Sequence, residues 1–470
     1  MNDFFDHREN DENDNIGYLI ERFDTMLKEG GSYFFDIEEY EDLIDFYMEM
    51  NDLKKCGAVI RHALEQYPGH TGFLIRQAQM LVSSNKAEKA LRVLAKVEDI
   101  DPFNSEIFIT KGAIYSQMKR YDDAIREYNK ALNDEEDFGS IYSNIAFEYE
   151  NLGNYDKAIE YLKKVLELEP DNEAIIFEIS FCFEITNRIE EAIIYFNAFV
   201  DRDPYSKFAW FNLGVAYNNQ ELYEKAIEAF EFAVAIDPSF SSAYFNKANS
   251  LAGMELYHQA IKTYLETFEH EEAEPLTYYY IGECYEKLSE FDKAIVYFKQ
   301  ATEMDDTLAD AWVGLGVCYE EKGNLQSALR FIRRGIELDP KNTDYLSTLA
   351  ACQQQSGFVS EAAISYEKAI EISAVEPDIY LDYSAMYAEI EEYDRAIEII
   401  TNGVLANFQN PSLLLREMAY HYMAGNPKYA YNHLELALNL CNKEDLQGLF
   451  DYAPQLKKDP IIIQLIEKAG

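Results

Sequence analysis

The stretch Lys207–Phe240, KFAWFNLGVAYNNQELYEKAIEAFEFAVAIDPSF, contains two apolar patterns separated by a short polar turn. Trp210 and Tyr217 stand two helical turns apart in the first half, and Tyr223 and Phe230 do so in the second. This spacing puts each pair on one face of a helix with 3.6 residues per turn. The closing Asp-Pro dipeptide ends the second helix, because proline cannot continue a helix. The stretch therefore predicts a helical hairpin of 34 residues.

Two small residues indicate how the helices of this hairpin pack. Gly214 and Ala226 have almost no side chain, so the two helix backbones can approach closely at these positions. Trp210, Tyr217 and Phe230 then fill the space on either side. The pattern is one of close packing and carries no chemistry of its own.

The same pattern recurs along the chain with a period of 34 residues and needs no insertion or deletion. Repeat units, counted from their first residue, begin at 37, 71, 105, 139, 173, 207, 241, 275, 309, 343, 377 and 411. The twentieth place of each unit is small, and it is occupied by Cys56, Ala90, Ala124, Ala158, Ala192, Ala226, Ala260, Ala294, Ala328, Ala362, Ala396 and Ala430. The eighth place is mostly glycine, alanine or serine, and the eleventh is commonly tyrosine.

With this period and this order of aromatic, small, tyrosine, alanine and proline residues, the chain resembles the tetratricopeptide repeat family. The resemblance implies an all-α fold, an α-α superhelical solenoid of about twelve helical hairpins with a concave groove. The family is defined by packing residues, so the resemblance does not identify a ligand.

The sequence outside the repeats suggests caps at both ends. Residues 1–15 are acidic and are predicted to be mobile, and a capping helix is predicted within 16–36, with its apolar pattern between Asn15 and Lys28. The repeat array occupies 37–444. Residues 445–470 are predicted to form C-terminal capping helices, of which Pro460–Lys468 carries an apolar run.

Charge and composition exclude several classes of partner. The formal net charge is −45, from 86 acidic and 41 basic residues, so the chain repels nucleic acid and anionic membrane surfaces. The N-terminus lacks a secretory pattern and no apolar run is long enough for membrane insertion, so we expect a cytoplasmic protein. Cys182, Cys284, Cys318 and Cys352 share the tenth place of their units and are predicted to be buried hydrophobic residues.

No motif for catalysis, a cofactor or a metal stands out, and we predict a non-enzymatic protein. The histidines are scattered along the sequence. His421 and His433 share the last unit and could approach each other, but we interpret them as packing residues.

The first helix of each unit carries a stripe of residues that should face the concave groove. The fifth, sixth and ninth places of the middle units are rich in aromatic residues and asparagines, which suit an extended peptide: amides contact its backbone and aromatic pockets hold its side chains. The predicted peptide-binding residues are Asn144, Phe147, Phe177, Phe181, Phe208, Phe211, Asn212, Asn218, Phe245, Asn246, Asn249, Tyr279 and Tyr280.

The character of the ligand follows from the charges on the same stripe. Glu150, Glu184, Glu283 and Glu286 lie on or beside it, so the preferred segment should be partly apolar or basic. The chaperone-tail clamp of this family needs lysine and arginine on the groove stripe. Here the fifth place has no lysine in any unit, and Arg76 and Arg416 lie at opposite ends of the array, which argues against acidic C-terminal tails.

Two other interpretations remain open. The aromatic residues can instead pack between neighbouring units, in which case their exposure would be low. The chain can also be a structural assembly protein, a homo-oligomer that pairs through its ends or its convex face, with an incidental groove.

Overall fold

A computed structural model describes residues 3–31, 33–132 and 138–469 of the chain. These residues form α-helices joined by short turns together with one 3-10 helix, and no strand occurs among them. The prediction of an all-α helical repeat fold is therefore confirmed. The chain divides into two compact parts, an N-terminal part up to Gln220 and a C-terminal part from Glu221.

The N-terminal part contains the helices α1 to α12. Their bounds are α1 Asp3–Glu29, α2 Ile37–Glu49, α3 Leu53–Gln66, α4 Thr71–Ser83, α5 Ala87–Ile100, α6 Ser105–Gln117, α7 Tyr121–Ala131, α8 Phe138–Asn151, α9 Tyr155–Leu168, α10 Glu173–Ile185, α11 Ile189–Arg202 and α12 Lys207–Asn219.

The C-terminal part contains the remaining helices. Their bounds are α13 Tyr223–Ile236, α14 Ser241–Gly253, α15 Tyr257–Thr267, α16 Pro275–Lys287, α17 Phe291–Met304, α18 Ala309–Glu321, α19 Leu325–Leu338, α20 Thr343–Gln355, α21 Val359–Ile372, α22 Pro377–Glu389, α23 Tyr393–Ala406, α24 Pro411–Met423, α25 Pro427–Ala437, α26 Lys443–Tyr452, the 3-10 helix η1 Pro454–Lys458 and α27 Pro460–Ala469.

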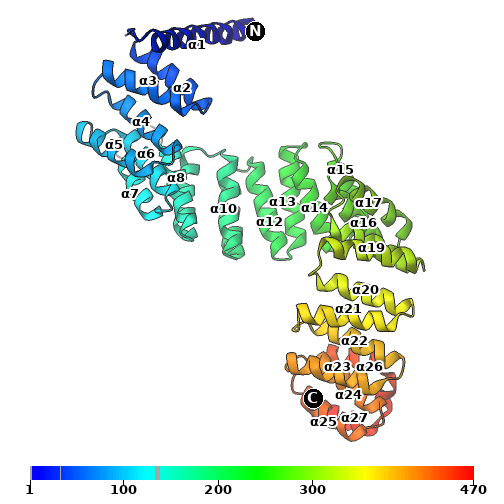
Figure 1. The fold of residues 1–470 in the computed structure, drawn as a ribbon. Coiled ribbons are helices and arrows are strands. Elements are labelled where there is room, and N and C mark those ends of the chain that lie inside the picture. The colour runs from blue at the N-terminus through cyan, green and yellow to red at the C-terminus, as the bar shows by residue number, and fades with distance from the viewer. Residues whose placement is uncertain (1–2, 32, 133–137, 470) are drawn as a thin grey trace. The chain divides into compact units, whose positions relative to one another are not determined.

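Even-numbered helices from α2 to α24 are the first helices of the repeat units, and odd-numbered helices from α3 to α25 are the second helices. Within each part, successive hairpins stack side by side (Figure 1). Several first helices thus lie near the first helix of the next unit in their part, as α10 does with α12 and α16 with α18.

The core of a unit forms where the eighth place meets the second helix. A Cβ atom on Gly282 would lie 2.7 Å from the ring of Phe298, at the twenty-fourth place of the same unit. Gly112 has the same relation to Tyr128. Every twentieth-place residue is buried, as a close helix crossing requires. The tenth-place cysteines are buried and unpaired, as predicted.

The turn between the two helices of a unit has one repeated backbone feature. The fifteenth place has a positive φ in every unit, whether it is glycine, as at Gly153 and Gly323, or another residue, as at Asn51, Lys119 and Glu255. At Gly153, the backbone N–H donates to the carbonyl of Glu150 at 2.8 Å. This left-handed residue closes the first helix and redirects the chain, which glycine does at the lowest cost.

The two ends of the chain carry additional helices. At the N-terminus α1 begins at Asp3, earlier than the helix predicted from Asn15, and Leu19 and Phe23 pack against the core of the first unit. The mobility proposed for 1–15 stays a prediction. At the C-terminus Leu449, Leu456 and Ile462, from α26, η1 and α27, bury the apolar face of α24 and α25.

Candidate ligand-binding surface

Three phenylalanines on the first helices of the N-terminal part are exposed to solvent. Phe147 on α8 is 57% exposed, and Phe177 and Phe181 on α10 are 39% and 48% exposed. Phe177 and Phe181 stand four residues apart, which places them on the same face of α10. Together with the half-buried Phe208 of α12, these residues form what we call the aromatic surface.

Contacts between rings hold the aromatic surface together. The ring of Phe177 meets the ring of Phe208 edge to face, with centroids 5.6 Å apart, and so joins α10 to α12. Phe177 also meets Phe211 edge to face at 5.9 Å. Edge-to-face aromatic pairs fix the rings in orientation, so the exposed edges present a defined apolar surface.

Two predicted contact residues on α12 are buried instead. Phe211 is only 8% exposed and Asn212 only 2%, so neither can touch a ligand in this structure. The Nδ2 of Asn212 donates to the backbone carbonyl of Phe208 at 2.8 Å, one helical turn back. This bond satisfies the buried amide within its own helix. Asn144 and Asn218 are half-buried.

The five predicted residues of the C-terminal part are half-buried and contact one another or nearby helices. Phe245 meets Tyr280 edge to face at 5.6 Å, and Tyr279 lies 5.8 Å from the ring of Phe298. Asn249 Oδ1 accepts a 2.5 Å hydrogen bond from the Tyr264 hydroxyl.

Asn246 differs from its neighbours because its amide turns back on its own helix. Its Nδ2 donates to the carbonyl of Ser242 at 2.9 Å. Much of the aromatic and amide pattern in this part therefore serves packing, which was the competing interpretation of the sequence.

Carboxylates beside the aromatic surface lie in a strongly negative environment. Burial, followed by the neighbouring Glu178 carboxylate, raises the pKa of Glu150 far above its ordinary value. The thiol of Cys182 lies 3.8 Å from Oε1 of Glu150, and burial raises the pKa of this thiol to about 12. In the C-terminal part, burial raises the pKa of Glu283 and Glu286 as well. A basic side chain from a ligand would stabilise the ionised form of each group.

The two arginines on the first-helix stripe are both engaged. Arg76 pairs with Asp45, with Nη2 and Oδ1 2.9 Å apart. The guanidinium of Arg416 lies 3.5 Å from the ring centroid of Tyr452 in the C-terminal cap. Both guanidinium groups therefore have partners within the chain, and the exclusion of an acidic tail stays a prediction.

Sequence reasoning overlooked two clefts because it considered only first helices. One, of about 760 Å³, is lined by residues of α21, α22 and α23, among them Glu367, Tyr383 and Arg395. The other, of about 580 Å³, is lined by residues of α9, α10 and α11, including Tyr195, and by Arg188 in the turn before α11. Both lie between second helices of adjacent units.

Models of the tetratricopeptide repeat match residues 105–133, 140–172, 208–240, 245–309 and 287–352. The chain is a tetratricopeptide repeat protein. No curated protein matches its sequence. Tetratricopeptide repeat proteins are generally non-enzymatic scaffolds, and membership of the family supports a role in protein interaction.

Several solved structures resemble this tetratricopeptide repeat protein in fold. YrrB, described as a TPR protein with an unusual peptide-binding site, is 21% identical; the match covers 38% of this chain and 92% of YrrB, with a TM-score of 0.32. The APC/C hetero-tetramer Cut9–Hcn1 is 14% identical over 83% of this chain and 89% of the matched chain, with a TM-score of 0.43. The C-terminal part of a TPR repeat-containing protein from Cytophaga hutchinsonii is 20% identical over 51% and 99%, with a TM-score of 0.40.

A helix that spans a membrane needs a long, continuous apolar segment. Across the described residues, no helix combines the length and the apolar character needed to cross a bilayer.

Proposed function

We propose that this tetratricopeptide repeat protein is a non-enzymatic scaffold that binds an extended, partly apolar or basic peptide segment on the aromatic surface of α8, α10 and α12. The observation that carries the proposal is the exposure of Phe147, Phe177 and Phe181 beside the half-buried carboxylate of Glu150. A folded chain gains free energy by covering large apolar side chains, so exposed phenylalanines that gather on successive helices favour a partner.

An extended segment suits the spacing of these residues. The exposed rings stand on neighbouring first helices, α8 and α10, and Phe208 continues the surface on α12. A peptide that crosses these helices can place alternate side chains against successive rings. Among the predicted amides of this part, the half-buried Asn144 is proposed to contact the peptide backbone, whereas the half-buried Asn218 already has an interaction within the chain.

A basic residue in the ligand is favoured by the electrostatics of the surface. Glu150 and Glu178 face each other between α8 and α10, and Glu184 is exposed on α10. A lysine or arginine placed beside Glu150 would offset the repulsion between the two carboxylates and release the proton that burial holds there. Binding should therefore tighten as the pH rises through the pKa of Glu150.

A different set of exposed residues supports the competing function, a self-assembling structural protein. Ile194, Val296 and Ile364 all stand at the twenty-second place of their units, on second helices, and are 70%, 54% and 63% exposed. Apolar residues repeated at one place of the second helix suit a contact with another copy of the chain.

One experiment separates the two functions. The purified chain is applied to an immobilised peptide array that samples apolar-basic, apolar-acidic and polar sequences, and its mass in solution is measured by light scattering. The scaffold proposal expects retention on apolar-basic peptides by a monomer. Equal retention on all classes, together with a dimer or larger species that Ile194→Asp dissociates, would favour the assembly function.

A further inference from the structure

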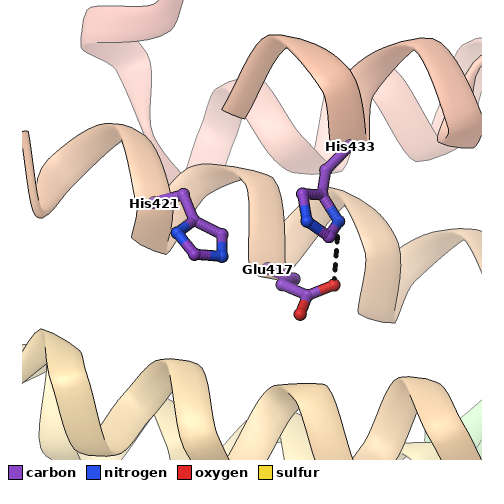
Figure 2. Close-up of side chains that lie close together, drawn as sticks. All are labelled: Glu417, His421 and His433. Atoms are coloured by element: carbon purple, nitrogen blue, oxygen red, sulfur yellow. Dashed lines mark ion pairs between the residues drawn. The ribbon is translucent and has the colours of Figure 1, made fainter. Parts of the chain in front are cut away.

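The last repeat hairpin gathers two histidines and one glutamate at a single point. Glu417 and His421 stand four residues apart on α24, so their side chains leave the same face of that helix. His433 reaches toward them from α25 (Figure 2). From the sequence, packing is predicted for the two histidines, and Glu417 is not associated with them.

Distances within the cluster are short. Oε2 of Glu417 lies 3.0 Å from Nδ1 of His433. The rings of His421 and His433 lie nearly parallel, with centroids 5.3 Å apart. One nitrogen or oxygen atom from each of the three residues lies within 4.8 Å of the other two. The three polar groups therefore converge on one small volume.

Apart from the ion pair between Glu417 and His433, the converging atoms have no hydrogen-bond partner of their own in the described part of the chain. Oε2 of Glu417 and the Nδ1 atoms of His421 and His433 are buried and have no aligned hydrogen-bond partner among the described residues. Glu417 is only 3% exposed. Buried polar atoms are normally satisfied, and here the only pairing among these atoms is the ion pair between Glu417 and His433, which leaves Nδ1 of His421 beside it without a hydrogen-bond partner among the described residues. A cation placed between the three groups would satisfy all of them.

Neighbouring residues hold the cluster in place. The Thr401 hydroxyl on α23 donates a 2.5 Å hydrogen bond to Oε1 of Glu417, which leaves Oε2 turned toward the histidines. Tyr429 stacks on the ring of His421 at 5.6 Å. Metal-binding carboxylates are commonly fixed by such outer hydrogen bonds.

We propose that Glu417, His421 and His433 form a binding site for one divalent transition-metal ion, for which zinc is the best chemical match. Two imidazoles and one carboxylate are ligands that zinc accepts, and three protein ligands leave a fourth position for water. Zinc at ~2.0–2.1 Å from each ligand separates ligand atoms by roughly 3.3 Å in a tetrahedron. Small side-chain rotations would close the present separations of up to 4.8 Å to that value.

A bound ion would have a structural effect in this position. Glu417 and His421 belong to α24 and His433 to α25, so the ion would link the two helices of the last unit. Because the ion binds the folded hairpin and not the unfolded chain, it should raise the thermal stability of the protein, and the rise should increase with the logarithm of the ion concentration relative to Kd.

The test uses the full chain without a histidine tag, freed of metal with a chelator and titrated with Zn²⁺ by calorimetry. We expect one equivalent to bind and the melting temperature to rise. Co²⁺ in place of Zn²⁺ should give the intense visible absorption of a tetrahedral site. A folded wild-type chain that shows neither one-equivalent binding nor this spectrum overturns the proposal.

Variants locate the ion. His433→Gln should abolish the one-equivalent step, and Glu417→Gln should weaken it at least tenfold. Thr401→Val should weaken it by ~10-fold to 100-fold, since the threonine only orients the glutamate. His258→Gln removes an exposed histidine from α15 and is the matched control, which should bind Zn²⁺ as the wild type does. If the His433 variant binds zinc unchanged while His258→Gln does not, the ion binds elsewhere and the proposal fails. If His433→Gln does not fold, the Co²⁺ spectrum of the wild type is the test of the site.

Discussion

A Cβ atom on Gly316 would lie 3.2 Å from the carbonyl oxygen of Ala328, so α18 and α19 touch through their backbones. The same atom would collide with Cγ1 of Ile332. We expect Gly316→Ala and Ala328→Leu each to lower the free energy of unfolding by about 1–3 kcal/mol, because overpacking a close helix crossing forces the helices apart. Urea denaturation followed by circular dichroism measures the change.

Gly448 provides the matched control for this substitution. It also lies within a helix, α26, but a Cβ atom there would meet nothing within 4 Å. Gly448→Ala should therefore be neutral or stabilise the chain by ~0.5–1 kcal/mol, since alanine favours the helix. Equal destabilisation by Gly316→Ala and Gly448→Ala would contradict the proposed packing.

The fifteenth place of the repeat offers a route to higher stability. Lys119 is exposed and has a φ of 58°, a conformation that costs a side chain about 1–2 kcal/mol. Lys119→Gly should raise the free energy of unfolding by ~0.5–1 kcal/mol, because glycine adopts this backbone without strain although its unfolded chain is more flexible. The shift of the urea midpoint measures this gain.

Two comparisons test the backbone explanation. Gly323→Ala, at the same place of another unit with a φ of 75°, should destabilise the chain by about 1 kcal/mol. Ala113→Gly changes an exposed residue inside α6 and should also destabilise, by ~0.5–1 kcal/mol. A gain in stability from Ala113→Gly would mean that glycine acts for a reason other than positive φ.

The raised pKa of Glu150 predicts how stability depends on pH. Burial and the Glu178 carboxylate make the folded-state pKa higher than the unfolded one, so the folded chain holds this proton more tightly. The associated stability is present below the unfolded pKa, about 4.3, and is lost as the pH rises through the folded pKa. We expect Glu150→Gln to match the wild type near pH 4 and to become the more stable protein by pH 8.

Glu184 is the control for this pH dependence. It is an exposed glutamate on α10 of the same surface, so the burial that affects Glu150 is absent there. The difference in unfolding free energy between Glu184→Gln and the wild type should not grow with pH in the way that it does for Glu150→Gln. Parallel growth for both variants would attribute the effect to net charge rather than to burial.

The repeat period was predictable from the sequence because packing between neighbouring helices repeats with the chain. Twentieth-place alanines such as Ala328 report a local crossing, and the structure buries each of them. Exposure at the candidate site was harder to predict. Phe177 and Phe211 occupy the same fifth place, yet they are 39% and 8% exposed.

The difference between these two phenylalanines arises from the side chains around them, which one unit does not specify. The ring of Phe177 meets the rings of Phe208 and Phe211 on α12, so its exposure depends on the neighbouring unit. The meeting of Glu417 with His433 similarly depends on the angle between two helices. A spacing of four residues could have associated Glu417 with His421, but it does not identify the third residue on α25.

The proposed peptide site on the aromatic surface can be tested with two phenylalanine substitutions. Phe177→Ala and Phe181→Ala should each weaken binding of an apolar-basic peptide selected from the array by ~1–2 kcal/mol, about fivefold to thirtyfold in Kd, because each removes an exposed apolar contact. Fluorescence anisotropy with the labelled peptide measures Kd. Phe103→Ala, which removes a 73% exposed ring from the loop before α6, should leave Kd unchanged.

Two further expectations concern the amide of Asn212 and the effect of salt on peptide binding. Because Asn212 is buried and bonded to the carbonyl of Phe208, Asn212→Ala should reduce stability rather than peptide affinity in the folded chain. Added salt should weaken binding modestly, since it screens Glu150 and Glu184 but leaves the apolar contacts intact. If Phe177→Ala, Phe181→Ala and Phe103→Ala all bind as the wild type does, the aromatic surface is not the peptide site, and self-assembly through the second helices becomes the leading function.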